Sequence, residues 1–253
     1  MIAFRLPCIL LSLLCVSAAY ADFEDLIRQG DYHDAQFQPE DALRYYTPAE
    51  KLRPDEPSLL VKIARQHVYR MDSLPSPAAK LDACRTALTY AERAVQIAPQ
   101  QCDPHLATAI CLGKMTPLLG NKQAVEASRR IKTCAETAIK LNPRNDFAWH
   151  MLGRWHQELA QVSGVTRTLA QIVYGGLPSA SLEEAKTCFE KAAALAPKRL
   201  IHAVELGRTY ALLGKKDEAR QWIRRGLSLP DRDKDDPETR QRGLATLRQL
   251  GDR

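Results

Sequence analysis

The strongest constraint on the fold is a spacing of small and large apolar residues that ends in a proline. In "EEAKTCFEKAAALAP", Ala185, Phe189, Ala192 and Pro197 follow one another at intervals of four, three and five residues. Steps of four and three keep these side chains on one face of a helix, and alanine lets a neighbouring helix approach closely. Proline lacks an N–H and clashes inside a helix, so it marks where the helix ends.

The same spacing recurs along the chain, with a looser copy near the C-terminus. The copies are Ala42, Tyr46, Ala49 and Pro54; Ala87, Ala91, Ala94 and Pro99; Ile131, Ala135, Ala138 and Pro143; and Ala219, Ile223, Gly226 and Pro230. A partner helix is expected before each copy, since Gly207 lies twelve residues before Ala219 and Gly30 twelve before Ala42. This pattern resembles the tetratricopeptide repeat, a helix–turn–helix unit of about 34 residues.

We therefore predict an all-α, tetratricopeptide-like solenoid of helical hairpins, with about five repeats and a terminal capping helix. The predicted repeat domain covers residues 22–253. Its units are residues 22–54, 57–99, 104–143, 146–197 and 200–231, with the cap at about residues 236–250. Close contact at Ala192 follows from this register.

The fourth unit carries an insertion. Gly153 and Ala185 are 32 residues apart where twelve would suffice, so about twenty extra residues, "QVSGVTRTLAQIVYGGLPSAS", lie between them. We expect a short helix at residues 166–173 in this segment, and then a capping box made by Ser181 and Glu184. In the second unit, "DSLPSPAAKLDACRTALTY" predicts a longer connection and a longer second helix.

The segment "NDFAWHMLGRWHQELA" invites comparison with a metal site, but its register favours packing. Trp149, Leu152, Gly153 and His156 take the positions of the large residue, leucine, glycine and aromatic residue of the repeat. His150 and His156 are six residues apart, whereas two ligands on one helix favour a spacing of four. We predict that Trp149 and Leu152 pack between helices and that no metal binds here.

Catalytic motifs find little support in the sequence. There is no G-x-S-x-G or H-E-x-x-H, and "LGKMT" has Thr108 where a phosphate-binding loop has its first glycine. The net charge of +6 is mild, and basic residues alternate with acidic ones, as in "KKDEARQWIRR". We predict a protein that is not an enzyme, needs no cofactor and binds no nucleic acid.

Four longer stretches resemble a known family, the regulator of microtubule dynamics proteins. They are "HLATAICLG", "AIKLNPRNDFAWHMLGRWHQELAQ", "RTLAQIVYGGLPSASLEEAKTCFEKAAALAP" and "ELGRTYALLGKKDEARQWIRRGLSLP", and the resemblance covers about residues 57–230. It implies a superhelical repeat domain without catalytic activity. Animal members are cytoplasmic, mitochondrial or spindle-associated proteins that contact microtubules.

The N-terminus departs from that family. Residues 1–5 carry a positive charge, "LPCILLSLLCV" is apolar, and Ala19 and Ala21 give the small-x-small pattern of a cleavage site. We expect residues 1–21 to be a signal peptide and the mature protein to be periplasmic or secreted, as in an exported bacterial relative. An uncleaved N-terminal membrane anchor is the alternative. The mature chain would keep five cysteines, whose odd number leaves at least one unpaired.

Stacked helical hairpins form a concave groove that binds partners, and the repeat register selects its lining. The expected lining is Phe147, His150, Arg154, Gln157 and Glu158 in the fourth unit; Ile201, Val204, Arg208, Ala211 and Leu212 in the fifth; and His105, Thr108 and Leu112 in the third. Arg154 and Arg208 occupy matching places, so they either converge on one anionic group or pair with local acids such as Glu158 and Glu205.

Three functions remain open at this point. The first is a non-catalytic binding or scaffolding protein whose groove takes a protein segment. The second is binding of a lipid or small anionic ligand, with Phe147, Ile201, Val204 and Leu212 around the acyl chain. The third is microtubule association, as the resemblance implies, which requires the domain to be in the cytoplasm.

Overall fold

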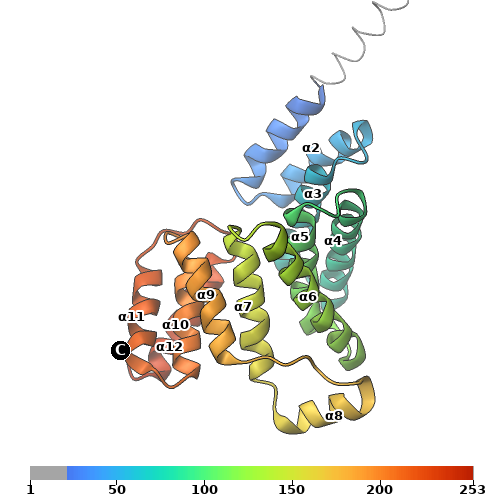
Figure 1. The fold of residues 1–253 in the computed structure, drawn as a ribbon. Helices are drawn as coiled ribbons and strands as arrows, with labels where there is room; N and C mark the ends of the chain where they lie inside the picture. The colour runs from blue at the N-terminus through green and yellow to red at the C-terminus, as the bar shows by residue number, and fades with distance from the viewer. Residues whose placement is uncertain (1–21, 253) are drawn as a thin grey trace, which may run out of the picture. The chain divides into compact units, whose positions relative to one another are not determined.

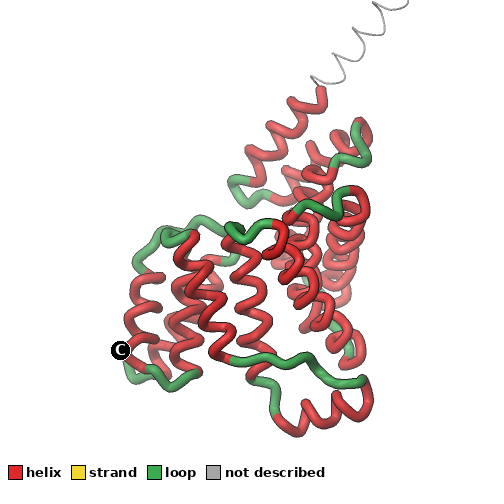
Figure 2. Tube along the Cα trace, viewed as in Figure 1, coloured by secondary structure: helices red, strands yellow, loops and turns green. Residues whose placement is uncertain are grey.

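The structure is a computed structural model that describes residues 22–252, and every regular element in this range is a helix (Figure 2). The chain forms two compact units, Met1–Ala98 and Pro99–Arg253. The boundary falls at the end of the second predicted repeat. The expected signal peptide, residues 1–21, lies outside the described residues.

The first unit consists of antiparallel helices joined by short turns (Figure 1). Its elements are a helix at residues 22–34, α2 (Pro39–Leu52), α3 (Pro57–Arg70), a short 3₁₀ turn (Met71–Ser73) and α4 (Pro77–Ile97). Tyr46 on α2 is fully buried in a cluster with Phe23, Leu59 and Ile63. The 21 residues of α4 confirm the longer second helix predicted for this repeat.

The second unit continues the pattern of paired helices. Its elements are α5 (Cys102–Met115), a 3₁₀ turn (Thr116–Leu118), α6 (Asn121–Leu141), α7 (Asp146–Ala160), α8 (Gly164–Tyr174), α9 (Leu182–Leu195), α10 (Leu200–Leu212), α11 (Lys216–Leu227) and α12 (Asp236–Gln249). Helix α5 pairs with α6, α7 with α9, and α10 with α11, while α12 packs on α10 and α11. Helix α12 is the predicted capping helix.

The residues of the recurring spacing that predicted the fold are the ones buried where the paired helices pack. The alanines and the large residue of every copy are buried, as in Ala185, Phe189 and Ala192. Helices α2, α4, α6 and α9 each end two residues before the proline of their copy. Ala192, where a close contact is expected, is fully buried.

The glycine of the repeat is required by close helix approach. A Cβ on Gly207 of α10 would lie 2.6 Å from Cγ1 of Ile223 and 2.9 Å from the carbonyl oxygen of Ala219, both on α11. Backbone atoms cannot retreat as a flexible side chain can, so this crossing needs a residue without a Cβ. At Gly153 of α7, a Cβ would lie 3.0 Å from the ring of Phe189.

Helix α8 is the inserted segment of the fourth repeat, and it confirms the short helix predicted there. The Ser163 hydroxyl caps its N-terminus by accepting from the Thr166 amide, and Gly175 ends it in the left-handed conformation, with φ of 73°. The predicted cap at Ser181 is also confirmed, because its hydroxyl accepts from the Glu184 amide at 3.1 Å. Among the described helices, none combines the length and apolarity needed to cross a bilayer.

Candidate functional site

The expected groove residues lie on α7 and α10, but many of them face neighbouring helices. His150, Gln157, Ile201 and Val204 are buried, so their side chains are interior to the helix layer. Phe147, Arg154, Arg208 and Ala211 are partly exposed, and Glu158 and Leu212 are exposed. In the third repeat, Thr108 and Leu112 are buried, and His105 is bonded through Nε2 to the Pro99 carbonyl at 2.8 Å.

The two matching arginines converge on a carboxylate of the protein itself. Glu205 of α10 is fully buried, and its Oε1 accepts from Arg154 of α7 at 3.1 Å. Its Oε2 accepts from Arg208, one turn along α10, at 2.6 Å. Arg242 of α12 donates to Oε1 from the other side at 3.0 Å. Glu205 thus joins three helices through three charge-assisted hydrogen bonds.

The outer ends of these arginines are also paired. Arg154 donates to Glu158 at 2.8 Å, and Arg242 donates to Glu238 at 2.6 Å. We name Glu205, Arg154, Arg208, Arg242, Glu158 and Glu238 the Glu205 cluster. Its three cations balance its three anions, so the cluster has no surplus positive charge for an anionic ligand. The pairing with local acids, which the sequence left open, is the arrangement present.

The electrostatics of the cluster hold Glu205 ionised. Burial raises the pKa of Glu205, but Arg154, Arg208 and Arg242 together lower it to about 2. A buried carboxylate is tolerated when several donors satisfy its lone pairs. The cluster therefore fixes how α7, α10 and α12 stack.

A second buried chain of polar groups joins α7 and α10. The Nδ1 atoms of His150 and His202 are 3.0 Å apart, and Nε2 of His202 is 2.8 Å from Asp146. Asp146 also pairs with Arg199 at 2.8 Å. Burial, and next the charge of His202, lowers the pKa of His150 well below its ordinary value, so His150 is neutral at physiological pH.

The two histidines that suggested a metal site have different surroundings. His156 lies 3.2 Å from Glu184 of α9, while His150 faces His202 of α10. Among residues 22–252, no three histidine, cysteine or acidic side chains are grouped as metal ligands would be. Trp155 is buried, and its ring N–H donates to the Ser128 carbonyl at 2.8 Å. Trp149 is only half-buried, and its ring N–H donates to the Pro143 carbonyl at 2.9 Å, whereas Leu152 is buried.

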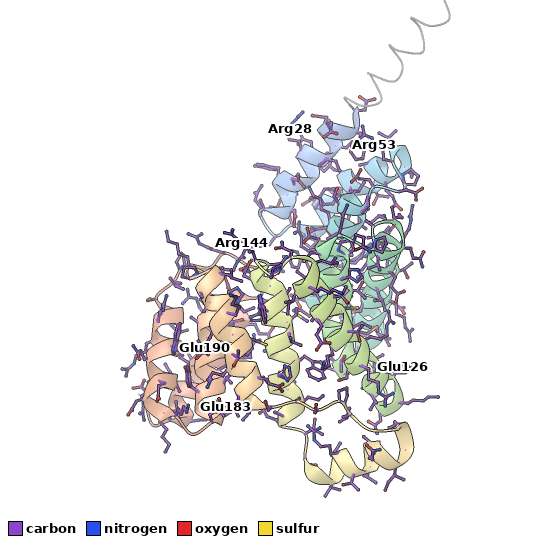
Figure 3. The ribbon with its side chains drawn as sticks, in the orientation of Figure 1. Arg28, Arg53, Glu126, Arg144, Glu183 and Glu190 are labelled. Atoms are coloured by element: carbon purple, nitrogen blue, oxygen red, sulfur yellow. The ribbon has the colours of Figure 1, made fainter. Side chains whose placement is uncertain are left out.

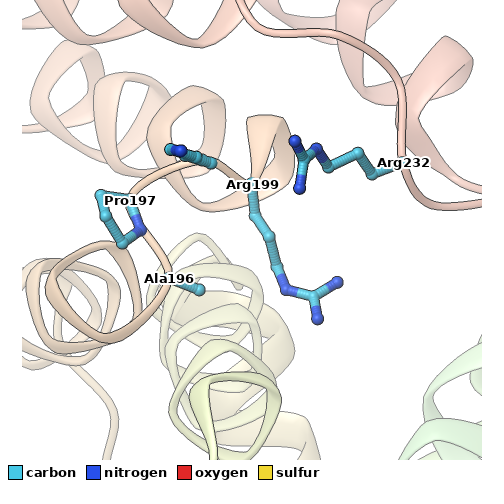
Figure 4. A pocket seen from close by; sticks show the side chains of 5 residues that line it. Ala196, Pro197, Arg199 and Arg232 are labelled. Carbon is cyan, nitrogen blue, oxygen red and sulfur yellow. The ribbon is translucent and has the colours of Figure 1, made fainter.

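A cationic pocket lies at the turn between α9 and α10 (Figure 4). Its volume is about 690 Å³, and it is lined by Ala196, Pro197, Lys198, Arg199 and Arg232. Arg199 is held by Asp146 and by Asp233, at 2.8 and 2.9 Å. Within the described part of the chain, Lys198 and Arg232 make no ion pair. The pocket therefore has two cations to offer to an anionic group.

This pocket was not predicted from the sequence. "PKR" at residues 197–199 was visible beside a helix-ending proline, but Arg232 joins it from a loop 33 residues further along. Only the return of the chain after α11 brings that loop to the α9–α10 turn. In the sequence, only the adjacent cations Lys198 and Arg199 pointed to a pocket at this turn.

The paired helices, the small-residue crossings and the capping helix define a tetratricopeptide-like repeat protein. The structure is similar to that of a thermophilic TPR protein of Thermus thermophilus, with a TM-score of 0.67, 17% identity, and coverage of 89% of this chain and 98% of that chain. It is also similar to pilF of Pseudomonas aeruginosa, with a TM-score of 0.59, 12% identity, and coverage of 92% and 93%. These likenesses show the fold.

The chain belongs to the regulator of microtubule dynamics protein family, whose profile, Regulator of microtubule dynamics protein 1-3, matches residues 26–251. Regulator of microtubule dynamics protein 1 of Bos taurus is 25% identical over 244 residues, which are 95% of this chain and 76% of the relative. The protein of the same name from Rattus norvegicus is 30% identical over 151 residues, 59% of this chain and 49% of the relative.

Proposed function

We propose that this protein is a non-catalytic scaffold that binds an acidic protein segment at the α9–α10 turn. The supporting observation is the cationic pocket, which Lys198 and Arg232 line together with the apolar Ala196 and Pro197. Repeat folds of this class present their surfaces to protein segments. The Glu205 cluster is neutralised internally, so the pocket is a better anion site than the arginine pair of the groove.

The pocket suits a carboxylate on a flexible segment. A guanidinium binds a carboxylate with two parallel hydrogen bonds, and a nearby ammonium adds charge without fixing direction. In Figure 4 the side chain of Arg232 extends from its loop toward the turn that carries Arg199. Arg199 is already fixed by two acids, so we assign it the role of a rigid wall and Arg232 the role of the binding cation.

A peptide library tests this proposal. Panning random peptides against the parent protein is expected to enrich sequences with carboxylates, and binding is expected to weaken as salt rises. Arg232→Gln is expected to weaken the enriched peptides about tenfold, since one charge-assisted contact contributes roughly 1.5–3 kcal/mol. Arg144→Gln is the control, because Arg144 is an exposed arginine at another turn (Figure 3). Equal losses in both variants would contradict the pocket assignment.

We further propose that the protein works outside the cytoplasm, on the strength of the apolar, small-x-small sequence of residues 1–21. N-terminal sequencing of protein isolated from its native cells is expected to begin at or near Asp22. An intact Met1 on a cytoplasmic protein would refute this compartment.

An intact Met1 on a cytoplasmic protein would instead favour a second candidate function, association with microtubules. Relatives of this chain are named regulators of microtubule dynamics, and a cytoplasmic protein would share a compartment with microtubules. Co-sedimentation with polymerised tubulin is the direct measurement. Binding of an acyl chain in the groove has less support, because Ile201 and Val204 are packed against neighbouring helices.

A further inference from the structure

Helix α8 presents its apolar side to solvent. Val165, Leu169, Ile172 and Val173 are exposed to 73%, 56%, 75% and 60%. Their spacing of four, three and one residues places all four on one side of the helix, which we name the α8 face. Aliphatic side chains normally turn toward the protein core, so the orientation of this helix is the reverse of an ordinary surface helix.

The opposite side of α8 attaches the helix to the rest of the second unit. Ala170 is buried there, and Arg167 donates to the carbonyl oxygen of Leu159. Arg129 of α6 donates to the carbonyls of Tyr174 and Gly176, at 2.6 and 2.7 Å. These bonds hold the C-terminal end of α8, so the α8 face is fixed in its outward orientation.

The charges around α8 are mostly positive. Residues 159–182 contain no acidic residue, and their only charged residue is Arg167. The first turns of α6, which contacts α8, add Lys122, Arg129 and Arg130 against one acid, Glu126. Figure 1 shows α8 outside the stack of paired helices, and Figure 3 places Glu126 on the nearby part of α6. An apolar face beside a cationic flank complements an anionic surface.

The size of the α8 face argues against a second copy as its occupant. Four exposed aliphatic side chains offer on the order of 400 Å². Two copies facing each other would bury roughly 800 Å², less than the roughly 1,000 Å² of a stable interface. A lipid surface has no such requirement, because a helix gains by inserting its apolar face at the headgroup boundary while cations attract anionic lipids.

We propose that α8 docks its apolar face onto an anionic lipid surface, with Lys122 and Arg130 of the neighbouring α6 near the headgroups. The inference rests on the outward aliphatic face, the anchoring of its other side and the cationic flank. It is independent of the cationic pocket, because the pocket follows the C-terminal end of α9 whereas α8 precedes its N-terminal end.

Hydrogen exchange of the full chain tests this proposal at α8 itself. The probe is a vesicle of phosphatidylcholine with about one third phosphatidylglycerol. We expect these vesicles to slow exchange of the α8 amides, and we expect added salt or pure phosphatidylcholine to weaken the effect. Because exchange is read helix by helix, any attachment through residues 1–21 does not hide the result at α8.

Matched variants decide whether the α8 face is responsible. Leu169→Gln with Ile172→Gln is expected to weaken protection by vesicles at least about tenfold, since two aliphatic side chains no longer insert. Leu244→Gln with Ile97→Gln is the control, because these residues are also exposed, at 41% and 39%, but lie elsewhere. Circular dichroism checks that both double variants are folded.

Three results would overturn the proposal. One is unchanged α8 exchange when anionic vesicles are added to the parent. Another is equal protection in the parent and in the α8 variant. The third is protection without vesicles that disappears on dilution, which would identify a second copy as the occupant of the α8 face.

Discussion

The carboxylate of Glu205 on α10 accepts a hydrogen bond at 3.1 Å from Arg154 on α7, which lies 51 residues earlier in the sequence. Glu205 is fully buried, while Arg154 keeps 28% of its side chain exposed. The pair connects the fourth repeat to the fifth, and Arg242 extends the connection to the capping helix.

Glu205→Gln is therefore expected to destabilise the second unit by about 3 kcal/mol. The expected loss is at the low end for a broken buried ion pair, because the three arginines can turn toward water. Urea unfolding followed by tryptophan fluorescence measures this unit directly, since Trp149, Trp155 and Trp222 all belong to it. Glu158→Gln removes an exposed carboxylate of the same cluster and is expected to cost less than about 1 kcal/mol.

Acid is expected to weaken the second unit through the same residue. The folded state lowers the pKa of Glu205 from 4.5 to about 2, so its ionised form stabilises the fold. That contribution is complete above the unfolded value and is lost as pH falls from about 4.5 toward 2. Urea midpoints measured across this range should fall in the parent more steeply than in Glu205→Gln.

Because of His150, the stability of the second unit is expected to begin falling at a higher pH than Glu205 alone would cause. Its pKa is lowered in the folded state, so the unfolded chain takes up a proton below about pH 6.5 while the folded chain does not. Stability is therefore expected to start falling below that value in both proteins. Parallel curves for the parent and Glu205→Gln below about pH 4.5 would contradict the role assigned to Glu205.

Gly207 and Gly113 both lie inside helices, but replacing each with alanine is expected to change the stability of the protein in opposite directions. Gly207→Ala places a Cβ against the α11 backbone and is expected to cost roughly 1–3 kcal/mol or more. Gly113→Ala meets only the end of Met151, at 3.4 Å, and is expected to stabilise the helix by about 0.5–1 kcal/mol. Urea midpoints compare the two, and equal effects would refute the close approach at Gly207.

The two tryptophans of α7 should differ in how much stability is lost when each is replaced by alanine. Trp155→Ala is expected to cost roughly 3–5 kcal/mol, because the ring is buried and its N–H is bonded to Ser128. Trp149→Ala is expected to cost only about 1–2 kcal/mol, because its ring is half-buried and bonded to Pro143. Calorimetric melting of the two variants ranks them, and the reverse order would show that Trp149 is the packing residue.

The repeat architecture was predictable because its information is local. Ala185, Phe189, Ala192 and Pro197 lie within one helix and its end, so periodicity and helix-breaking chemistry were enough to identify them. The short helix at α8 was also predicted from the inserted sequence, whereas its capping residue, Ser163, was found only in the structure. The insertion was visible in the 32 residues between Gly153 and Ala185, and the match over residues 26–251 confirms the family resemblance.

The site depends on contacts that no local pattern contains. Whether Arg154 faced a ligand or Glu205 depended on how α7, α10 and α12 stack, and both alternatives were compatible with the sequence. Trp149 and Trp155 illustrate the same difficulty within one helix. The repeat consensus favoured the first, whereas the contact of α7 with α6 buries the second. The outward orientation of α8 was equally hidden, since an amphipathic sequence does not say which side meets the protein.

Helices α7 and α9 pack directly against each other, although α8 and its loops separate them along the chain. The hairpin of the fourth repeat is therefore complete without the segment between them. A long surface excursion costs little extra closure entropy, because that cost grows only with the logarithm of its length. The connection between α7 and α9 is thus a site where a helix can be inserted, exchanged or lost during evolution. The core of the fourth repeat, formed by α7 and α9, does not depend on it.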